Sequence, residues 1–430
     1  MRTANRACGL SAVQFGFIEN RSATTPRPPP FPLGAMTHLT SSMPSKMEPN
    51  VVRTALAGAV AMAVAMGLGR FFYTPVLPAM MEGLGLGPAE AGWIASANYV
   101  GYLLGAILAA YGWAEGIERK VAMSALVATA LLLFAMGVSS NLAILTAIRF
   151  FAGLSSAFAM IFTTAIVLSH GLASGKSWVQ AGHFGGVGSG IFISAIMFGL
   201  IILLDGGWRM AWIMASVLAF AGLAFVLRYL PREVVRSGPP KKEPPLVWTA
   251  PMMGLTVAYG IFGFGYIVTA TFLVAIVRDG GGSSLFEAGV WLVTGIAAAP
   301  SVAYWLPVAK RWGLVNVFAI GCLVEAFGVA VSVLVPLPVG PIVGGVLLGC
   351  TFVAVTAFGL QAGRQLAVES PRRALALMTA AFGVGQILGP VVAGYLADWT
   401  GTYTWASLAA AAALLASGAI VLVLSKPRSA

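Results

Sequence analysis

The stretch MGLGRFFYTPVLP, residues 66–78, places an arginine in the middle of the first long apolar segment of the chain. A charged side chain inside hydrocarbon costs about 3 kcal/mol or more, so an arginine in such a segment marks a functional site by default. Arg70 is therefore the first candidate for a binding residue. The rest of the sequence indicates which class of protein contains this arginine.

The composition is that of a protein that lies in a lipid bilayer. Of the 430 residues, 59% are hydrophobic and 9% are charged, whereas roughly 25% of the residues of soluble proteins are charged. The net charge of +11 does not indicate a nucleic-acid partner, because the basic residues fall in polar breaks between apolar segments. The three cysteines and three histidines form no metal-ligand spacing, and no nucleophile stands with a base. We therefore expect no enzyme, no catalytic residue, no metal and no cofactor.

Apolar runs of about 20 residues alternate with short polar breaks from residue 51 onward. As a helix, such a run crosses roughly 30 Å of hydrocarbon at about 1.5 Å per residue. The pattern predicts an all-α membrane protein with twelve transmembrane helices. They are expected at 54–80, 89–112, 121–139, 142–168, 179–203, 208–227, 248–277, 288–309, 314–334, 341–361, 374–396 and 403–424.

The positions of Lys and Arg predict how these helices are oriented. With a cytoplasmic N-terminus, 21 of the 25 basic residues fall in cytoplasmic regions, and only Arg209 and Arg278 fall outside. Arg70 and Arg149 lie within predicted helices. Cytoplasmic loops of membrane proteins carry the excess of Lys and Arg. We therefore expect a multi-pass protein of the cell (inner) membrane with both termini in the cytoplasm.

A long polar break divides the predicted helices into two sets of six. We expect an N-terminal half at 51–230, a cytoplasmic linker at 231–246 and a C-terminal half at 247–425. Three short motifs recur roughly 195 residues apart, among them Gly-Val-Gly at 186–188 and 383–385. Two parallel halves of this kind are typical of transporters that work by alternating access.

Residues 1–50 differ from the rest, because they are rich in Pro, Ser and Thr and contain no long apolar run. The segment is expected to be a disordered tail. A transit peptide is a second interpretation. In a third, Met36, Met43 or Met47 is the true start, and the upstream residues are an extension of the gene assignment.

Several motifs resemble the major facilitator superfamily of secondary transporters. RFFAG at 149–153 is similar to the arginine motif of its fourth helix, and the glycines of the predicted fifth and eleventh helices are similar to its gating motif. The loop at 118–120 departs from the pattern, since it keeps the basic pair without a clearly placed aspartate. The resemblance covers about 51–425. It implies the major facilitator fold, with two pseudo-symmetric six-helix halves and a central cavity lined by helices 1, 4, 7 and 10.

A narrower resemblance rests on three separated segments. GLGRFFYTP at 67–75, YGIFGFGY at 259–266 and FGVGQILGP at 382–390 are similar to the YbfB/YjiJ branch of that superfamily. The branch implies transport but little about the substrate.

The candidate substrate-binding residues follow from this architecture and from side-chain chemistry. Arg70 shares one face of an α-helix with the residues three and four positions later, which are Tyr73 and Thr74. Arg149 either faces the cavity or caps carbonyls of a neighbouring helix. The full predicted set is Arg70, Tyr73, Thr74, Asn98, Arg149, Tyr259, Tyr266 and Gln361.

Two residues are candidates for proton coupling. Glu325 is an acid in the middle of the ninth predicted helix, and either it carries a proton or it is a neutral acid bonded to a neighbouring helix. His183 near the start of the fifth predicted helix is either a proton relay or a packed residue.

The candidate gating residues are glycines and prolines of the first, fifth and eleventh predicted helices. Pro75 and Pro78 each remove a helix hydrogen bond, so the outer end of the first helix is expected to be kinked. The predicted gating set is Gly67, Gly69, Pro75, Pro78, Gly186, Gly190, Gly385, Gly389 and Pro390.

The sequence thus predicts a monomeric secondary active transporter, a symporter or antiporter, whose partners are a small-molecule substrate and the lipid bilayer. The solute is expected to be small, organic and anionic or zwitterionic, and to move by proton-coupled alternating access. A multidrug or hydrophobic-metabolite exporter is the alternative within transport, and a sensor that moves no solute is the alternative outside it. The sequence leaves the substrate, the direction and the coupling ion open.

Overall fold

The computed structural model describes residues 51–176, 178–235 and 243–424. In these ranges the chain forms helices joined by short turns, without a strand. The predictions for residues 1–50 lie outside the described residues, as does the middle of the predicted linker.

The first membrane span is a single run with an irregular centre. It consists of α1 (Val51–Met62), the π-helix η1 (Ala63–Phe71) and α2 (Tyr73–Leu84). The rest of the first half consists of α3 (Pro88–Ala110), α4 (Glu118–Val138), α5 (Leu142–Ala173), α6 (Trp178–Leu203) and α7 (Trp208–Tyr229). The second half consists of α8 (Ala250–Asp279), α9 (Ser284–Ala298), α10 (Ser301–Trp312), α11 (Leu314–Leu334), α12 (Val339–Leu366), α13 (Pro371–Thr400) and α14 (Thr404–Leu424).

The predicted number of spans is confirmed. In the described part of the chain, 11 helices are long and apolar enough to cross a membrane, or 12 if the bent pair α9 and α10 counts as one span. That pair covers the eighth predicted segment and bends by 43°. Pro300 lies at the bend, where it has no N–H to continue the helix.

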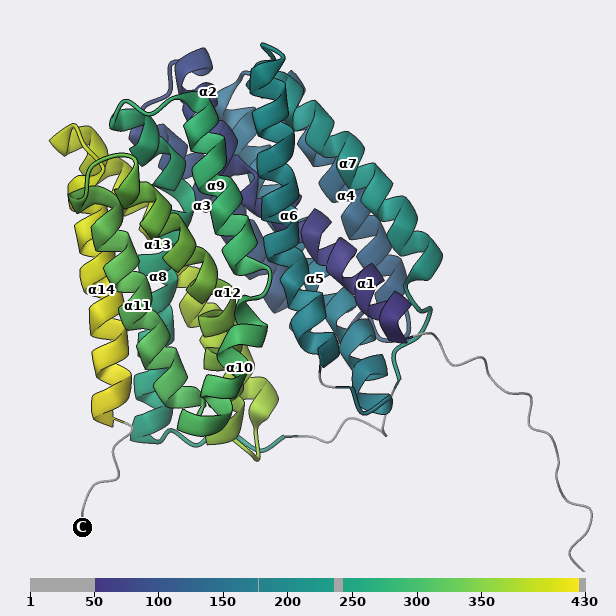
Figure 1. Cartoon of the computed structure of the whole chain (residues 1–430). Coiled ribbons are helices and arrows are strands. Elements are labelled where there is room, and N and C mark those ends of the chain that lie inside the picture. The colour runs from purple at the N-terminus through teal and green to yellow at the C-terminus, as the bar shows by residue number, and fades with distance from the viewer. Residues whose placement is uncertain (1–50, 177, 236–242, 425–430) are drawn as a thin grey trace, which may run out of the picture. The chain divides into compact units, whose positions relative to one another are not determined.

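The two halves repeat one packing pattern, which can be followed in Figure 1. In the first half α1 packs on α6, α3 on α5, and α4 on α7. The matching pairs of the second half are α8 on α13, α9 on α12, and α11 on α14. The two halves are therefore pseudo-symmetric, as the resemblance to the major facilitator fold implied.

Close contact between the halves depends on small residues. The main pairs across the boundary are α3 with α13, α6 with α9, and α2 with α8. A Cβ on Gly92 would overlap the carbonyl oxygen of Pro390, and a Cβ on Gly188 would overlap the backbone nitrogen of Ala299. The helices can approach this closely only because these positions lack a side chain.

The two ends of the helix bundle differ in how the halves are joined. We call the end that carries Leu230 and Thr249 the linker end, and the opposite end the far end. Among the described residues, every hydrogen bond between the halves joins residues 74–99 to residues 270–403, on the far-end side. The halves are therefore linked toward one end. The sequence predicts that the linker end is the cytoplasmic one.

Candidate functional site

Arg70 lies near the end of η1, where the first span departs from α-helical geometry. Two glycines just before it let neighbouring helices approach. A Cβ on Gly67 would press on the backbone of Gly190 in α6, and a Cβ on Gly69 would lie 2.8 Å from the methyl group of Thr129 in α4. Gly67 and Gly190, both predicted gating residues, thus form one tight helix contact, while their part in gating stays a prediction.

The prolines lie after the irregular stretch of the first span. That stretch ends at Phe71, and α2 continues as an α-helix through Pro78. Pro75 occupies the first turn of α2, where backbone N–H groups have no partner within the helix. The π-helix is thus an irregularity upstream of the prolines that the sequence did not predict, and the kink expected at Pro75 and Pro78 stays a prediction.

Arg149 of α5 donates to two carbonyls at the end of this irregular stretch. Pro75 has no N–H for the carbonyl of Arg70, five residues earlier, which a π-helix would pair with it. Arg149 donates from Nη1 to the carbonyl of Gly69 and from Nη2 to that of Arg70, each at 3.1 Å. Of the two readings of Arg149, the contacts match the helix cap, and its role in substrate binding stays a prediction.

The guanidinium of Arg70 is enclosed by aromatic rings of its own half. Its carbon lies 4.2 Å from the ring centre of Tyr102, 4.8 Å from that of Tyr99 and 5.6 Å from that of Phe71. Such cation–π contacts stabilise a buried guanidinium while leaving its N–H edges unused. Arg70 is 2% exposed, and its Nε and Nη2 have no hydrogen-bond partner among the described residues.

The second half contributes aromatic rings that face those around Arg70. We call Phe71, Tyr99 and Tyr102 the ring cage, and Tyr266, Phe352 and Phe382 the ring wall. Phe71 contacts Phe352 of α12 edge to face, with ring centres 5.5 Å apart. Tyr266 of α8 lies nearly parallel to Phe352 and to Phe382 of α13, at 8° and 10°. Arg70 therefore lies at the boundary of the halves, with aromatic residues on both sides.

The other predicted binding residues near Arg70 mostly make helix–helix hydrogen bonds. Tyr73 donates to the carbonyl of Ala91 at 2.9 Å, and Thr74 donates to the carbonyl of Ala270 in the other half. Asn98 donates to the carbonyl of Arg149 at 3.0 Å. None of these three side chains bonds to Arg70 in the described ranges, and their role in binding stays a prediction.

The predicted residues of the second half divide into two groups. Tyr266 accepts a hydrogen bond from Gln386, and Tyr259 donates to the carbonyl of Thr356 at 3.0 Å. Tyr266 belongs to the ring wall, and Tyr259 stacks on Phe382 of that wall. Gln361 is half-buried and lies nine residues beyond Phe352 on α12, roughly 13 Å closer to the linker end. The fold does not bring it to Arg70.

The two proton-coupling candidates also lie apart from Arg70. Glu325 of α11 is fully buried beside Thr351 of α12, and neither carboxyl oxygen has a hydrogen-bond partner in the described ranges. His183 of α6 is fully buried and shares a hydrogen bond of 2.9 Å with Thr164 of α5. Both stay predictions as proton carriers.

Tyr99, Tyr102, Phe352 and Phe382 are contacts of the site that lie outside the predicted binding set. Tyr99 and Tyr102 are three residues apart on one helix and therefore share a face. That spacing was a usable signal. Phe382 lies in the segment 382–390 that carries the family resemblance, which gave it no role of its own, and nothing in the sequence marks Phe352 among the chain's 24 phenylalanines.

A paired arginine lies at the far end. Arg278 of α8 donates from Nε and Nη2 to the two carboxylate oxygens of the buried Glu287 of α9, the second bond being 3.0 Å long. Its Nη1 donates across the boundary to Glu82 of α2 at 2.9 Å. The chain thus contains its own example of an arginine that holds a carboxylate by its side edge.

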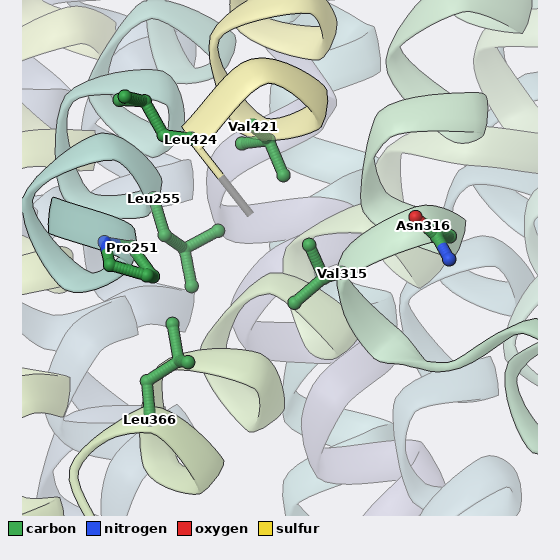
Figure 2. Close-up of a pocket in the computed structure, with 7 residues that line it drawn as sticks. All are labelled: Pro251, Leu255, Val315, Asn316, Leu366, Val421 and Leu424. Atoms are coloured by element: carbon green, nitrogen blue, oxygen red, sulfur yellow. The ribbon is translucent and has the colours of Figure 1, made fainter. Parts of the chain in front are cut away.

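Two cavities lie away from Arg70. One of about 250 Å³ opens near the linker end of the second half, and Figure 2 shows its lining, which is Pro251, Leu255, Val315, Asn316, Leu366, Val421 and Leu424. Its one polar side chain, Asn316, donates to the carbonyl of Trp312 at 2.8 Å. The other, of about 530 Å³, is lined by Leu396, Trp399, Thr400, Trp405, Leu408 and Ala409. Neither contains a charged group, so they add no candidate for binding an ion.

Sequence comparisons place the chain in a family. The model of the family described as "Uncharacterised MFS-type transporter YbfB" matches residues 62–422. Monocarboxylate transporter 13 of Bos taurus is 27% identical over 277 residues, which are 63% of this chain and 65% of that protein. The chain thus spans somewhat less than two thirds of the bovine relative. Monocarboxylate transporter 13 of Rattus norvegicus is 26% identical over 349 residues, 78% of this chain and 80% of that protein.

Solved structures agree on the fold. The nucleoside transporter NupG superposes with a TM-score of 0.64 at 15% identity, over 88% of this chain and 99% of NupG. A bacterial homologue of the human lysosomal transporter Spinster, in an inward-facing and unoccupied conformation, superposes with a TM-score of 0.62 at 12% identity, over 88% of this chain and 96% of that one. At such identities the likeness concerns the fold alone. The family match covers most of the chain, so this protein belongs to the YbfB family of major-facilitator-type membrane transporters.

Proposed function

We propose that this protein is a secondary active transporter of small organic carboxylates, which it moves by alternating access of its two halves. The observation that carries the proposal is the state of Arg70. It is buried at the boundary of the halves, and Nε and Nη2 have no partner among the described residues. A fold bears the cost of such a charge when the charge serves the function.

The identity of those two nitrogens favours a carboxylate. Nε and Nη2 form one side edge of the guanidinium, which matches the two oxygens of a carboxylate in a bidentate pair. Arg278 uses the same two nitrogens to hold both oxygens of Glu287. The monocarboxylate transporters similar to this chain carry a substrate of that class in their names, which supports the proposal.

Alternating access is supported by where the halves are joined. In the described ranges the hydrogen bonds between halves lie on the far-end side of the boundary, from the level of Tyr99 outward. Arg70 contacts Tyr99 and therefore lies next to this joined region. If these contacts opened while others formed at the linker end, Arg70 would become accessible from the opposite side of the membrane.

Proton coupling is the finer part of the proposal, and Glu325 is its first candidate. A carboxyl group that binds and releases a proton during transport needs no permanent cation beside it. No ion pair of Glu325 is present in the described part of the chain. Proteoliposomes loaded with a pH-sensitive dye test this. Solute addition to wild-type protein should change the internal pH, and Glu325→Gln should abolish that change while exchange of labelled solute continues.

The experiment that tests the function is counterflow of a labelled carboxylate in proteoliposomes. Wild-type protein should accumulate the label, and Arg70→Gln should not, although it is expressed and folded. Arg311→Gln is the matched control, because Arg311 is an exposed residue of α10 at the linker end. Wild-type counterflow by the Arg70→Gln variant contradicts the assigned role.

The aromatic rings around Arg70 favour one alternative, the export of hydrophobic compounds. A lipophilic cation such as tetraphenylphosphonium distinguishes the two functions, because an arginine-centred site repels it. We expect it not to compete with the labelled carboxylate. Competition by this cation, together with indifference to carboxylates, would support the exporter instead.

A further inference from the structure

Tyr266, in the ring wall opposite Arg70, lies nearly parallel to its aromatic neighbours. Its ring is within 18° of parallel to three rings, those of Phe262, Phe352 and Phe382. The ring centres are 5.2 to 6.0 Å apart, in the range of offset stacking. The rings come from three different helices, α8, α12 and α13, so the stack is not a consequence of spacing along one helix.

Three rings at the boundary of the halves keep a small accessible area. Tyr102 and Phe382 are each 7% exposed and Phe352 is 5% exposed. Phe262 is fully buried, and Phe358, less than two turns along α12 from Phe352, is 1% exposed. Aromatic rings from both halves therefore contribute to the small accessible area at this boundary.

The charges near Arg70 limit what else a solute can carry. Arg149 is the other buried arginine of the described first half, and it has both terminal nitrogens bonded to backbone carbonyls. A second carboxylate would therefore have no free cation of that kind. Glu325, the buried acid without an ion pair, lies on α11 beside Thr351 and Cys322, and not in the ring cage, so an ammonium group would have no carboxylate there.

We infer that the solute is an aromatic monocarboxylate, whose carboxylate pairs with Nε and Nη2 of Arg70 and whose ring lies against the Phe352–Phe382–Tyr266 wall. This inference rests on the proposed function, since it takes Arg70 as the carboxylate anchor. It narrows the solute from any small organic anion or zwitterion to a flat one with a single negative charge and no ammonium group.

Competition against labelled benzoate in proteoliposomes tests the class of solute. Cyclohexanecarboxylate has the charge and nearly the size of benzoate but a puckered ring, and it should compete about 2- to 10-fold more weakly, the range expected for loss of ring stacking. Terephthalate, with a second carboxylate, and phenylalanine, with an ammonium group, should compete more weakly still. Equal competition by cyclohexanecarboxylate and benzoate overturns the inference.

Variants of the wall test the placement. Phe352→Leu and Phe382→Leu should each reduce the preference for benzoate over cyclohexanecarboxylate by about 2- to 10-fold. Phe327→Leu is the matched control, because Phe327 is 62% exposed on α11, and it should leave the preference unchanged. An unchanged preference in both wall variants contradicts the placement, and the ratio of two ligands measured on one variant does not depend on how much protein folds.

The two levels of the proposal fail in different ways. If acetate, cyclohexanecarboxylate and benzoate all exchange equally well and depend on Arg70, the transporter of carboxylates stands and the aromatic class is wrong. If no carboxylate exchanges or raises the melting temperature of the purified protein, both are wrong.

Discussion

Arg70 and Arg278 lie at the boundary between the halves, but only Arg278 is paired. Arg278 holds the buried Glu287 with one edge and reaches Glu82 of the other half with its third nitrogen. The guanidinium of Arg70 lies against aromatic rings, and its Nε and Nη2 have no partner in the described ranges. The desolvation of Arg278 is offset by the protein's own acids, while that of Arg70 is offset only in part by cation–π contacts. The difference supports the proposal that Arg278 serves the fold and Arg70 serves a ligand.

Arg70→Gln should have the largest effect on function and a small effect on stability. Loss of a buried charge pair with the carboxylate costs about 3–5 kcal/mol, so binding should weaken on the order of 100-fold or more. The melting temperature of the protein without ligand should stay level or rise, because a poorly paired buried charge is removed. Thermal-shift assays with and without carboxylate measure both quantities.

A conservative variant separates charge from geometry at this position. Arg70→Lys keeps the charge but has no planar edge with two donors, so it should recover only part of the binding. Full recovery by lysine would mean that charge alone matters and that the bidentate geometry is not used. A marked fall of the ligand-free melting temperature in Arg70→Gln would instead make Arg70 a structural residue like Arg278.

Arg149→Gln should have the second-largest effect, and that effect should be on the stability of the fold. The variant loses the charge-assisted bonds to the carbonyls of Gly69 and Arg70, at 3.1 Å each. We expect the free energy of unfolding to fall by about 2–3 kcal/mol, since hydrogen bonds to charged groups contribute about 1.5–3 kcal/mol. The melting temperature of the ligand-free protein gives the readout. If stability is unchanged but binding is lost, Arg149 joins Arg70 as a ligand residue.

Arg278→Gln should have a smaller effect, about 1–2 kcal/mol on unfolding, because the arginine side chain is 31% exposed while that of Glu287 is buried. The double variant Arg278→Gln with Glu287→Gln should recover most of this loss, because no buried acid is then left without a cation. Carboxylate binding by either variant should match the wild type. Reduced binding in both would break the division between a structural and a functional arginine.

The fold was largely predictable because it depends on properties that the sequence displays directly. Apolar runs of helix-spanning length gave the twelve spans, and the broken eighth span still fell within one predicted segment, 288–309. The family match then confirmed the resemblance drawn from segments such as 67–75. The helix boundaries needed no knowledge of tertiary contacts.

The site was predictable only in part, because its contacts cross between helices. The expectation that Tyr73 and Thr74 share a face with Arg70 assumed 3.6 residues per turn, whereas Arg70 lies in a π-helix with wider turns. The hydroxyls of Tyr73 and Thr74 bond to carbonyls of α3 and α8, and their shared face with Arg70 stays a prediction. Phe352 and Phe382 approach Arg70 only through the pairing of the halves, which one-dimensional patterns do not contain.

Glu82→Gln should have the smallest effect, and it isolates the one bond by which Arg278 crosses the boundary. The side chain of Glu82 is 78% exposed, so its ion pair with Arg278 should contribute no more than about 0.5 kcal/mol to stability. This bond exists only while the far end is joined, whereas the bond to Glu287 stays within the second half.

Accessibility of a cysteine introduced at the far end, for example Met81→Cys, measures how often that end opens. A modest rise in labelling for Glu82→Gln, smaller than for Arg278→Gln, fits an arginine whose main task is to neutralise Glu287. Equal rises would mean that the main task of Arg278 is to hold the two halves together at the far end. Arg278 would then take part in the conformational change, and it would no longer serve as the structural counterpart of Arg70.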